Sequence, residues 1–374
     1  METCDVVIAG GGPAGSTCAW KLRQAGLDVV VVDRAMFPRD KVCAGWITPQ
    51  VLAALDLDAR AYRQGRTWQP FTGFRVGLIG GGEDVAAEYD HPVSFGVRRC
   101  EFDHYLLQRS GARLRLETPI SSVRRDGLQW IVNDCLKAPM LVGAGGHFCP
   151  VARILNGRAD AAPLVVAQEA EFAIDPRDNA SYTVLPEQPE LYFSRGLNGY
   201  GWCLRKQNHL NIGFGHLDRR TLPGAIAEFA AFLEARGRIP GHVSPRWKGH
   251  AYLLSEAPGR HRVDDGVLLV GDAAGLAYPQ SGEGIRPAIE SGLIAASTII
   301  QAHNRYSRSR LRPYEDQLRE RFGVGRRSSF VSQALPRALG RVLGPWLLRT
   351  PYFVRHVLID RWFLHAHEPA LAPS

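Results

Sequence analysis

The sequence predicts an α/β fold in which a doubly wound parallel sheet is interrupted by an antiparallel sheet and followed by C-terminal helices. Three stretches support this prediction. Residues 5–34 run from an apolar strand through a helix to a second apolar strand, which is the order of a βαβ unit. Residues 161–254 consist mainly of strand-forming segments with one helix. Residues 267–300 then return to a buried strand followed by an apolar helix.

The first βαβ unit carries a glycine-rich turn of the Rossmann, dinucleotide-binding type. Three glycines in G-x-G-x-x-G spacing follow the first strand, and an acid ends the second: Gly10, Gly12, Gly15 and Asp33. In order, these glycines permit a tight turn, let the backbone approach a pyrophosphate and let the helix pack on the strand. The N–H groups at the helix start favour phosphate, and the acid accepts hydrogen bonds from ribose hydroxyls. The motif predicts a dinucleotide without separating FAD from NAD.

A second glycine-containing loop lies far along the chain, after the strand 267–270. Asp272 ends this strand and is placed to hold a polyol or ribitol hydroxyl, although an acid at this position caps a helix as often as it binds a ligand. The helix 285–300 begins after Gly284, and its positive dipole end suits the pyrimidine edge of a flavin. Two such loops on one sheet fit a long cofactor such as FAD better than NAD.

The composition and the cysteine spacing argue against several classes of protein. The chain has 374 residues, a formal net charge of +8 and seven cysteines without a C-x-x-C pair, so neither a disulfide framework nor a zinc site is indicated. No apolar run approaches the roughly 18–20 residues of a membrane-spanning helix. Because the first strand begins almost at Met1, we expect no signal peptide and a cytoplasmic location.

We expect three parts in the chain. A discontinuous FAD-binding domain comprises residues 1–70, 95–160 and 255–304. A substrate-binding β-sheet domain comprises 71–94 and 161–254. A basic helical segment, 305–374, follows.

The C-terminal segment concentrates the positive charge of the chain. Between Arg305 and Leu364 there are 13 arginines, no lysine and four acidic residues, and Pro336, Pro345 and Pro351 divide the segment into short helices. One interpretation is a set of helices that pack on the FAD domain and expose a solvated basic face. The other is a peripheral surface for anionic lipid headgroups. No nucleic-acid recognition motif is present, so we expect no nucleic-acid partner.

Three further features have alternative interpretations. The loop 37–48, with Arg39, Lys41 and Cys43, either lines a cofactor cleft or only connects a strand to a helix. Arg99, just before the helix expected within the stretch 98–111, either pairs with a pyrophosphate or is a surface arginine at a helix start. Tyr200 and Trp202, in a strand of the inserted sheet, either wall an apolar pocket or pack in the core.

Six motifs together resemble the geranylgeranyl reductase branch of the p-hydroxybenzoate hydroxylase-like flavoproteins. They are DVVIAGGGPAGSTCAWKLRQAGLDVVVVDR, DKVCAGW, RRCEFDHYLL, YGWCLRK, LNIGFG and GDAAGLAYPQSGEGI, and they extend to about residue 300. Leu204 and Arg205 stand where the family's aromatic signature usually has Phe and Pro. Two hallmarks of neighbouring branches are absent: the Asp-Gly pair of the hydroxylases and the iron–sulfur cysteines of quinone-linked electron-transfer flavoproteins.

The motifs and the resemblance together imply a set of site residues. Expected to bind FAD are Gly10, Gly12, Pro13, Ala14, Gly15, Asp33, Arg34, Cys43, Ala44, Gly45, Arg99, Asp272, Gly284 and Ile285. Expected at the substrate are Tyr200, Trp202 and Tyr278. Cys43 and Tyr200 are the candidate proton donors, and no metal ligand is expected.

The expected function is an FAD-dependent oxidoreductase that reduces carbon–carbon double bonds of an isoprenoid or other lipid-like substrate. NAD(P)H or a reduced protein would supply the electrons. Two alternatives stay open: a flavin-dependent monooxygenase of an aromatic or lipophilic substrate, and an electron-transfer flavoprotein.

Overall fold

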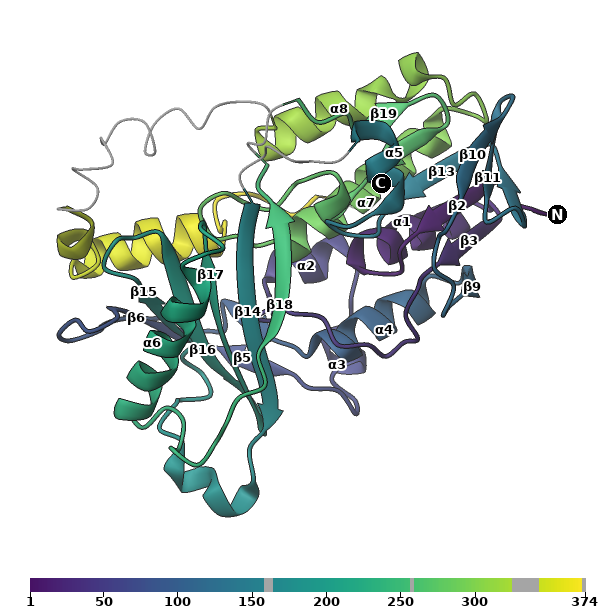
Figure 1. Cartoon of the computed structure of the whole chain (residues 1–374). Coiled ribbons are helices and arrows are strands. Elements are labelled where there is room, and N and C mark those ends of the chain that lie inside the picture. Colours follow the sequence, from purple (N-terminus) through teal and green to yellow (C-terminus); the bar gives the residue numbers. More distant parts are fainter. Residues whose placement is uncertain (158–163, 256–258, 325–342, 372–374) are drawn as a thin grey trace.

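The computed structural model describes residues 1–157, 164–255, 259–324 and 343–371 (Figure 1). Its central element is a six-stranded sheet whose strands, in spatial order, are β19 (Val263–Asp264), β20 (Val267–Leu269), β13 (Met140–Gly143), β2 (Val6–Ala9), β3 (Val29–Val32) and β9 (Arg113–Arg115). All neighbours except β19 and β20 pair in parallel. The four middle strands are buried along their whole length, which explains their unbroken apolar runs.

Helices pack around this sheet. They are α1 (Pro13–Gln24), α4 (Arg99–Arg109), α5 (Pro150–Asn156), α7 (Ile285–Gln301) and α8 (Arg308–Phe322). The short helices α2 (Pro49–Ala54) and α3 (Ala59–Tyr62) form a separate cluster with α4 and α7. The first βαβ unit and the last strand–helix unit meet where α1 packs against α7. Gly292 permits this approach, because a Cβ there would lie 2.5 Å from the Ala14 carbonyl oxygen. The predicted α/β fold class with a Rossmann-type unit is confirmed.

A seven-stranded sheet forms the second layer (Figure 1). Its spatial order is β18 (Lys248–Leu253), β14 (Leu164–Ala173), β17 (His209–His216), β16 (Gly199–Lys206), β15 (Glu190–Phe193), β6 (Gly73–Leu78) and β7 (Val85–Glu88). Its neighbouring strands pair antiparallel except β15 and β6, which are parallel. Residues 73–88 thus join strands from beyond residue 163 in one sheet. The expected boundary at residue 160 falls outside the described residues.

The two faces of this sheet are covered by different elements. Helix α6 (Leu222–Ala235) packs Ile226, Phe229 and Leu233 against one face. The π-helical segment η3 (Phe353–Phe363), yellow in Figure 1, packs its buried residues with Phe74, Leu191 and other residues of the opposite face.

Shorter elements complete the fold. One small sheet consists of β1 (Glu2–Thr3), β12 (Leu136–Ala138), β11 (Gln129–Val132) and β10 (Val123–Asp126), and another of β4 (Trp46–Ile47), β8 (Ser94–Gly96) and β5 (Gln69–Phe71). Two short turns are η1 (Pro176–Ser181) and η2 (Gly271–Ala273).

The C-terminal segment divides between the two layers. Helix α8 packs on α7 through Leu311, Tyr314 and Leu318, as expected for helices on the cofactor domain. In contrast, η3 packs on the seven-stranded sheet, because its apolar residues match the apolar face that α6 leaves uncovered. The part around Pro336 lies outside the described residues. Within the described ranges, no helix is both long and apolar enough to cross a bilayer.

The residues after η3 are tied back to the start of α7 by one buried arginine. Arg286 is fully buried and pairs with Glu290 at 2.9 Å. Its other nitrogens donate to the carbonyl oxygens of His365, Glu368 and Pro369 at 3.0–3.2 Å. The chain end thereby contacts the helix that begins at the second glycine loop.

Candidate active site

A cavity of about 700 Å³ lies between the two sheets and brings both glycine loops together. Its position at the carboxyl ends of the parallel strands is the place where open α/β sheets bind ligands. Most of the residues expected at the site line it: Gly10, Gly12, Pro13, Ala14, Asp33, Arg34, Cys43, Ala44, Arg99, Tyr200, Trp202, Asp272, Gly284 and Ile285.

Three expected site residues lie outside the cavity wall. Gly15 faces the strand instead, since a Cβ there would collide with the Gly10 carbonyl oxygen, so it lets α1 pack on β2. Gly45 adopts a φ of +62°, and a Cβ there would collide with the Val97 carbonyl oxygen. Its role is to let the loop approach the backbone of Val97, whose N–H donates to the Gly45 carbonyl oxygen at 2.7 Å.

Tyr278, which we expected at the substrate, does not line this cavity. Its ring stacks on His365 with centroids 3.7 Å apart, and its hydroxyl donates to Glu368 Oε2 at 3.3 Å. Both partners belong to the segment after η3, and no sequence pattern places that segment beside residue 278. Tyr278 therefore packs against the tail and does not face the cavity.

One end of the cavity is formed by the first glycine turn. Gly10 has a φ of +123°, and a Cβ there would collide with the Ala144 carbonyl oxygen, so only glycine fits. Gly12 is the N-cap of α1, and no side chain in the described residues caps this terminus. Asp33 accepts hydrogen bonds from the Gly11 and Ala35 N–H groups at 2.8 and 2.9 Å, which fixes its carboxylate beside the turn.

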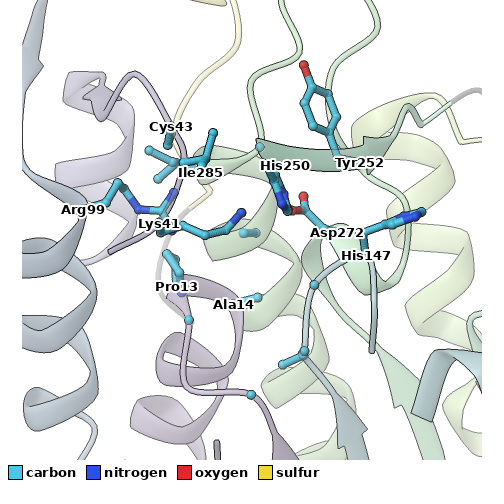
Figure 2. Close-up of a pocket in the computed structure, with 18 of the residues that line it drawn as sticks. Pro13, Ala14, Lys41, Cys43, Arg99, His147, His250, Tyr252, Asp272 and Ile285 are labelled. Atoms are coloured by element: carbon cyan, nitrogen blue, oxygen red, sulfur yellow. The ribbon is translucent and has the colours of Figure 1, made fainter. Parts of the chain in front are cut away.

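Basic side chains surround the α1 N-terminus (Figure 2). Arg99 donates twice to Asp103, at 2.7 and 2.9 Å, and Arg39 pairs with the same carboxylate at 3.2 Å. Burial lowers the pKa of Lys41 to about 8, although Asp272 opposes the shift. The Arg39 Nη1 atom is buried and has no hydrogen-bond partner among the described residues.

These groups fit the pyrophosphate of a dinucleotide. An uncapped helix N-terminus, a buried guanidinium nitrogen without a partner and a lysine with a lowered pKa all gain from an anion placed among them. The Asp33 carboxylate, which follows β3 and lines the cavity, would accept hydrogen bonds from ribose hydroxyls. The structure therefore agrees with an extended dinucleotide in this cavity.

Asp272 lies in η2, directly after β20, and faces His250 of β18. The His250 Nε2 and Asp272 Oδ2 atoms are 3.5 Å apart. Burial lowers the pKa of His250, whereas burial of Asp272 is outweighed by His250 and Lys41, so the pKa of this carboxyl falls below its usual value. Asp272 is thus held ionised in the cavity wall and can accept hydrogen bonds from hydroxyl groups.

The opposite end of the cavity is aromatic. Its wall contains Trp46, Tyr200, Trp202, Phe363 and Leu191. Tyr200 lies 5.4 Å from Phe363 and 6.2 Å from Trp202 between ring centroids. This end therefore suits an apolar ligand.

The two candidate proton donors differ in their surroundings. Cys43 is half-buried in the cavity wall, and its Sγ accepts from the Gly45 N–H at 3.4 Å. Tyr200 donates its hydroxyl hydrogen to the Ser281 carbonyl oxygen, and burial raises its pKa well above the usual value. A phenol in this state is a poor acid, so the geometry favours Tyr200 as a wall of the cavity.

Sequence reasoning missed several contributors to this site. His250 lies on β18, where alternating residues His250 and Tyr252 both face the cavity. Phe363 comes from the C-terminal segment, which one interpretation placed on the FAD domain and the other at a lipid surface. Glu169 and Glu171 lie on β14, where two acids at alternate positions in a largely apolar strand indicate a buried polar partner.

Comparisons with known proteins agree with this site. Residues 5–77 match the family model described as FAD dependent oxidoreductase. The menaquinone reductase of Mycolicibacterium smegmatis is 28% identical over 92% of this chain and 88% of its own length. The digeranylgeranylglycerophospholipid reductase of Methanocaldococcus jannaschii is 26% identical over 86% of this chain and 83% of its own length.

A solved structure also shares the fold. The geranylgeranyl bacteriochlorophyll reductase-like protein of Thermoplasma acidophilum superposes with a TM-score of 0.72 at 22% identity, covering 100% of this chain and 94% of that one. The fold, the cavity and the comparisons define the protein as an FAD-dependent oxidoreductase. The resemblance to the geranylgeranyl reductase branch is confirmed, since reductases of this group are among its relatives.

FAD, when bound, supplies hydride transfer. The described residues supply anion-binding groups at one end of the cavity and an apolar wall at the other, which orients a ligand and excludes water around it.

Proposed function

We propose that this oxidoreductase adds two hydrogens across a carbon–carbon double bond of an isoprenoid or other lipid-like substrate. The observation that carries the proposal is the continuity of one cavity from the basic glycine turn to the aromatic end formed by Trp46, Tyr200, Trp202 and Phe363. Relatives named for geranylgeranyl lipids and for menaquinone, whose substrates carry isoprenoid chains, support it.

The proposed roles follow from the geometry. The cavity-lining residues of the two glycine loops, with Asp33, Arg99 and Asp272, hold FAD, while Gly15 and Gly45 support the backbone around it. Residues 1–70, 95–160 and 255–304 form the cofactor domain. Tyr200 and Trp202 wall the substrate end. Cys43 is the side chain we propose to protonate the second alkene carbon, because it lies in the wall between the basic and aromatic ends.

The overall reaction consumes one hydride from reduced FAD and one proton from the protein, and it leaves oxidised FAD and a saturated bond. To test it, the purified protein is reduced without oxygen and mixed with a polyprenyl substrate. Flavin reoxidation with a product two hydrogens heavier supports the proposal. A product that gains oxygen, and only in air, replaces it with the monooxygenase. Reoxidation only by a protein or quinone replaces it with the electron-transfer flavoprotein.

The same assay examines the individual residues and the electron donor. Cys43→Ser is expected to keep FAD binding and to slow the protonation step, whereas Tyr200→Phe is expected to retain most of the turnover. Supplying NADH, NADPH or a reduced protein in place of chemical reductant identifies the donor. Equal turnover of wild-type protein and Cys43→Ser removes the thiol from the mechanism.

We further propose that the C-terminal segment contacts anionic membrane lipids, where a lipid substrate would be found. Trp346 and Tyr352 expose 64% and 72% of their surface, and Arg349, Arg355 and Arg361 are exposed around them. Aromatic and arginine side chains together favour a lipid headgroup surface. Co-sedimentation with anionic vesicles is expected at low salt and is expected to weaken in Trp346→Ser but not in Leu128→Ser, an exposed apolar residue elsewhere. Absence of binding at low salt overturns this proposal.

A further inference from the structure

One asparagine connects the cofactor end of the cavity with its substrate end. Asn211, on β17, is completely buried. Its Oδ1 accepts the Trp202 Nε1–H at 2.7 Å, and its Nδ2 donates to the Cys43 carbonyl oxygen at 3.3 Å. Trp202 and Cys43 both line the cavity. A single side chain therefore holds a residue at each end.

Two glutamates of β14 fix the asparagine in this orientation. The Asn211 Nδ2 group also donates to Glu169 Oε1 at 3.0 Å and to Glu171 Oε2 at 3.1 Å. Glu169 Oε2 accepts the N–H of Cys43. Both backbone groups of Cys43 are thus bound by side chains of the seven-stranded sheet.

The network extends to charged partners that keep Glu171 ionised. Fully buried Lys206 donates to Glu171 Oε2 at 2.7 Å, and Arg98 donates to Oε1 at 3.0 Å. The asparagine amide cannot rotate without losing the Trp202 bond and placing its oxygen against the carboxyl groups of Glu169 and Glu171. Since every member has a partner, the network stabilises one arrangement of the site.

We propose that Asn211 is a positioning residue that sets the distance between the Cys43 loop and the Trp202 indole, and hence between the cofactor and the substrate. Asn211 has this role through its hydrogen bonds and not through the volume of its side chain. The inference rests on the proposed function only where it assigns the two ends of the cavity to the cofactor and the substrate. The coupling between Cys43 and Trp202 can be measured without substrate.

The experiment measures alkylation of Cys43 by iodoacetamide in the full-length protein, followed by peptide mass spectrometry, with and without bound FAD. Loss of one or two loop hydrogen bonds in Asn211→Leu is expected to accelerate alkylation about tenfold. Trp202→Phe removes the indole donor and is expected to accelerate it also, although Trp202 makes no hydrogen bond to Cys43. In the Asn211→Leu background, Trp202→Phe is expected to add nothing.

Two glutamate variants distinguish a role in positioning the Cys43 loop from a general effect on the stability of the sheet. Glu169→Gln changes an acceptor of the Cys43 loop, whereas Glu190→Gln changes another buried glutamate of the same sheet, bonded to Tyr192 and Arg238. Only Glu169→Gln is expected to change Cys43 alkylation. If Asn211→Leu fails to fold, the comparison of Trp202→Phe, Glu169→Gln and Glu190→Gln decides the question. Additive effects of Trp202→Phe and Asn211→Leu, or equal effects of the two glutamate variants, overturn the proposal and leave the reductase test unaffected.

Discussion

Phe363, the last residue of η3, packs edge-on against Tyr200 of β16, with ring centroids 5.4 Å apart and planes at 78°. It also stacks on Trp46 at 5.8 Å. Because Phe363 lies in the cavity wall, a residue near position 370 lines the same cavity as the glycine turn near position 10.

Replacing Phe363 by alanine is expected to open the aromatic end. Phe363 and Phe322 expose 6% and 7% of their surface, but Phe322 lies in the core around α7 and α8, away from the cavity. Both alanine variants should lower the free energy of unfolding by about 3–5 kcal/mol, measured by urea denaturation. Only Phe363→Ala should also raise the KM for a polyprenyl substrate. An equal rise in Phe322→Ala would contradict the assignment of the cavity wall.

Gly213 provides the space for the Trp202 ring. A Cβ at residue 213 would overlap the indole, whereas a Cβ at residue 215, two positions along the same strand, meets its nearest atom at 4.0 Å. Gly213→Ala is expected to displace the ring and to lower the free energy of unfolding by about 1–3 kcal/mol. Gly215→Ala should leave both unchanged. Tryptophan fluorescence and thermal unfolding check the comparison, and similar behaviour of the two variants would refute it.

Lys41 should make FAD affinity depend on pH. Burial lowers its pKa to about 8, so its ammonium group, which favours the pyrophosphate, is lost as the pH rises through 8. The groups that face Lys41 are Asp272, Arg99, Cys43, Arg39 and His250. We therefore expect FAD affinity to fall about tenfold between pH 7 and pH 9.5, measured by flavin fluorescence.

The controls test whether Lys41 is the group that causes the pH dependence of FAD affinity. The measurement is made in Cys43→Ser protein, which removes the neighbouring thiol, and burial lowers the pKa of His250, so this histidine is neutral throughout the range. Lys41→Met should abolish the dependence, whereas Lys137→Met, at a partly exposed lysine of β12 that pairs with Asp126, should preserve it. A pH dependence that survives in Lys41→Met assigns it to another group.

Glu169 should make stability decrease as the pH rises from about 4.5 to 7. Burial raises its pKa to about 7, despite the opposing effects of Lys206, the Cys43 N–H and Asn211, while Glu171 adds to the rise. In this window the folded protein holds a proton that the unfolded chain has lost, so the free energy of unfolding falls with increasing pH, by at most about 3 kcal/mol. Glu169→Gln should lack this component in denaturation curves at pH 5 and pH 7.5. If the free energy of unfolding changes by the same amount between these pH values in the wild-type protein and in Glu169→Gln, the raised pKa of Glu169 is contradicted.

The cofactor end of the site was predictable because its signals are local. The turn at Gly10 and Gly12, the acid at residue 33 and the loop before α7 each lie within one strand–helix unit, where spacing alone determines geometry. The two loops converge because parallel strands end at the same edge of a sheet.

The substrate end was predictable only in part, because it depends on contacts between distant segments. Tyr200 and Trp202 lie where the sequence suggested, but nothing near residue 363 indicates that its ring reaches Tyr200. The same reason explains Tyr278, whose partners His365 and Glu368 come from the tail. The apolar face that η3 covers becomes evident only once the seven strands are ordered.

The attachment of the tail to Arg286 has a consequence for biosynthesis. The guanidinium group remains buried only when the carbonyl groups of residues 365, 368 and 369 accept its hydrogens. A nascent chain still in the ribosomal exit tunnel has made the glycine turn hundreds of residues earlier, but it has neither this partner nor the ring of Phe363. Stable loading with FAD should therefore wait until residues 363–369 have left the exit tunnel.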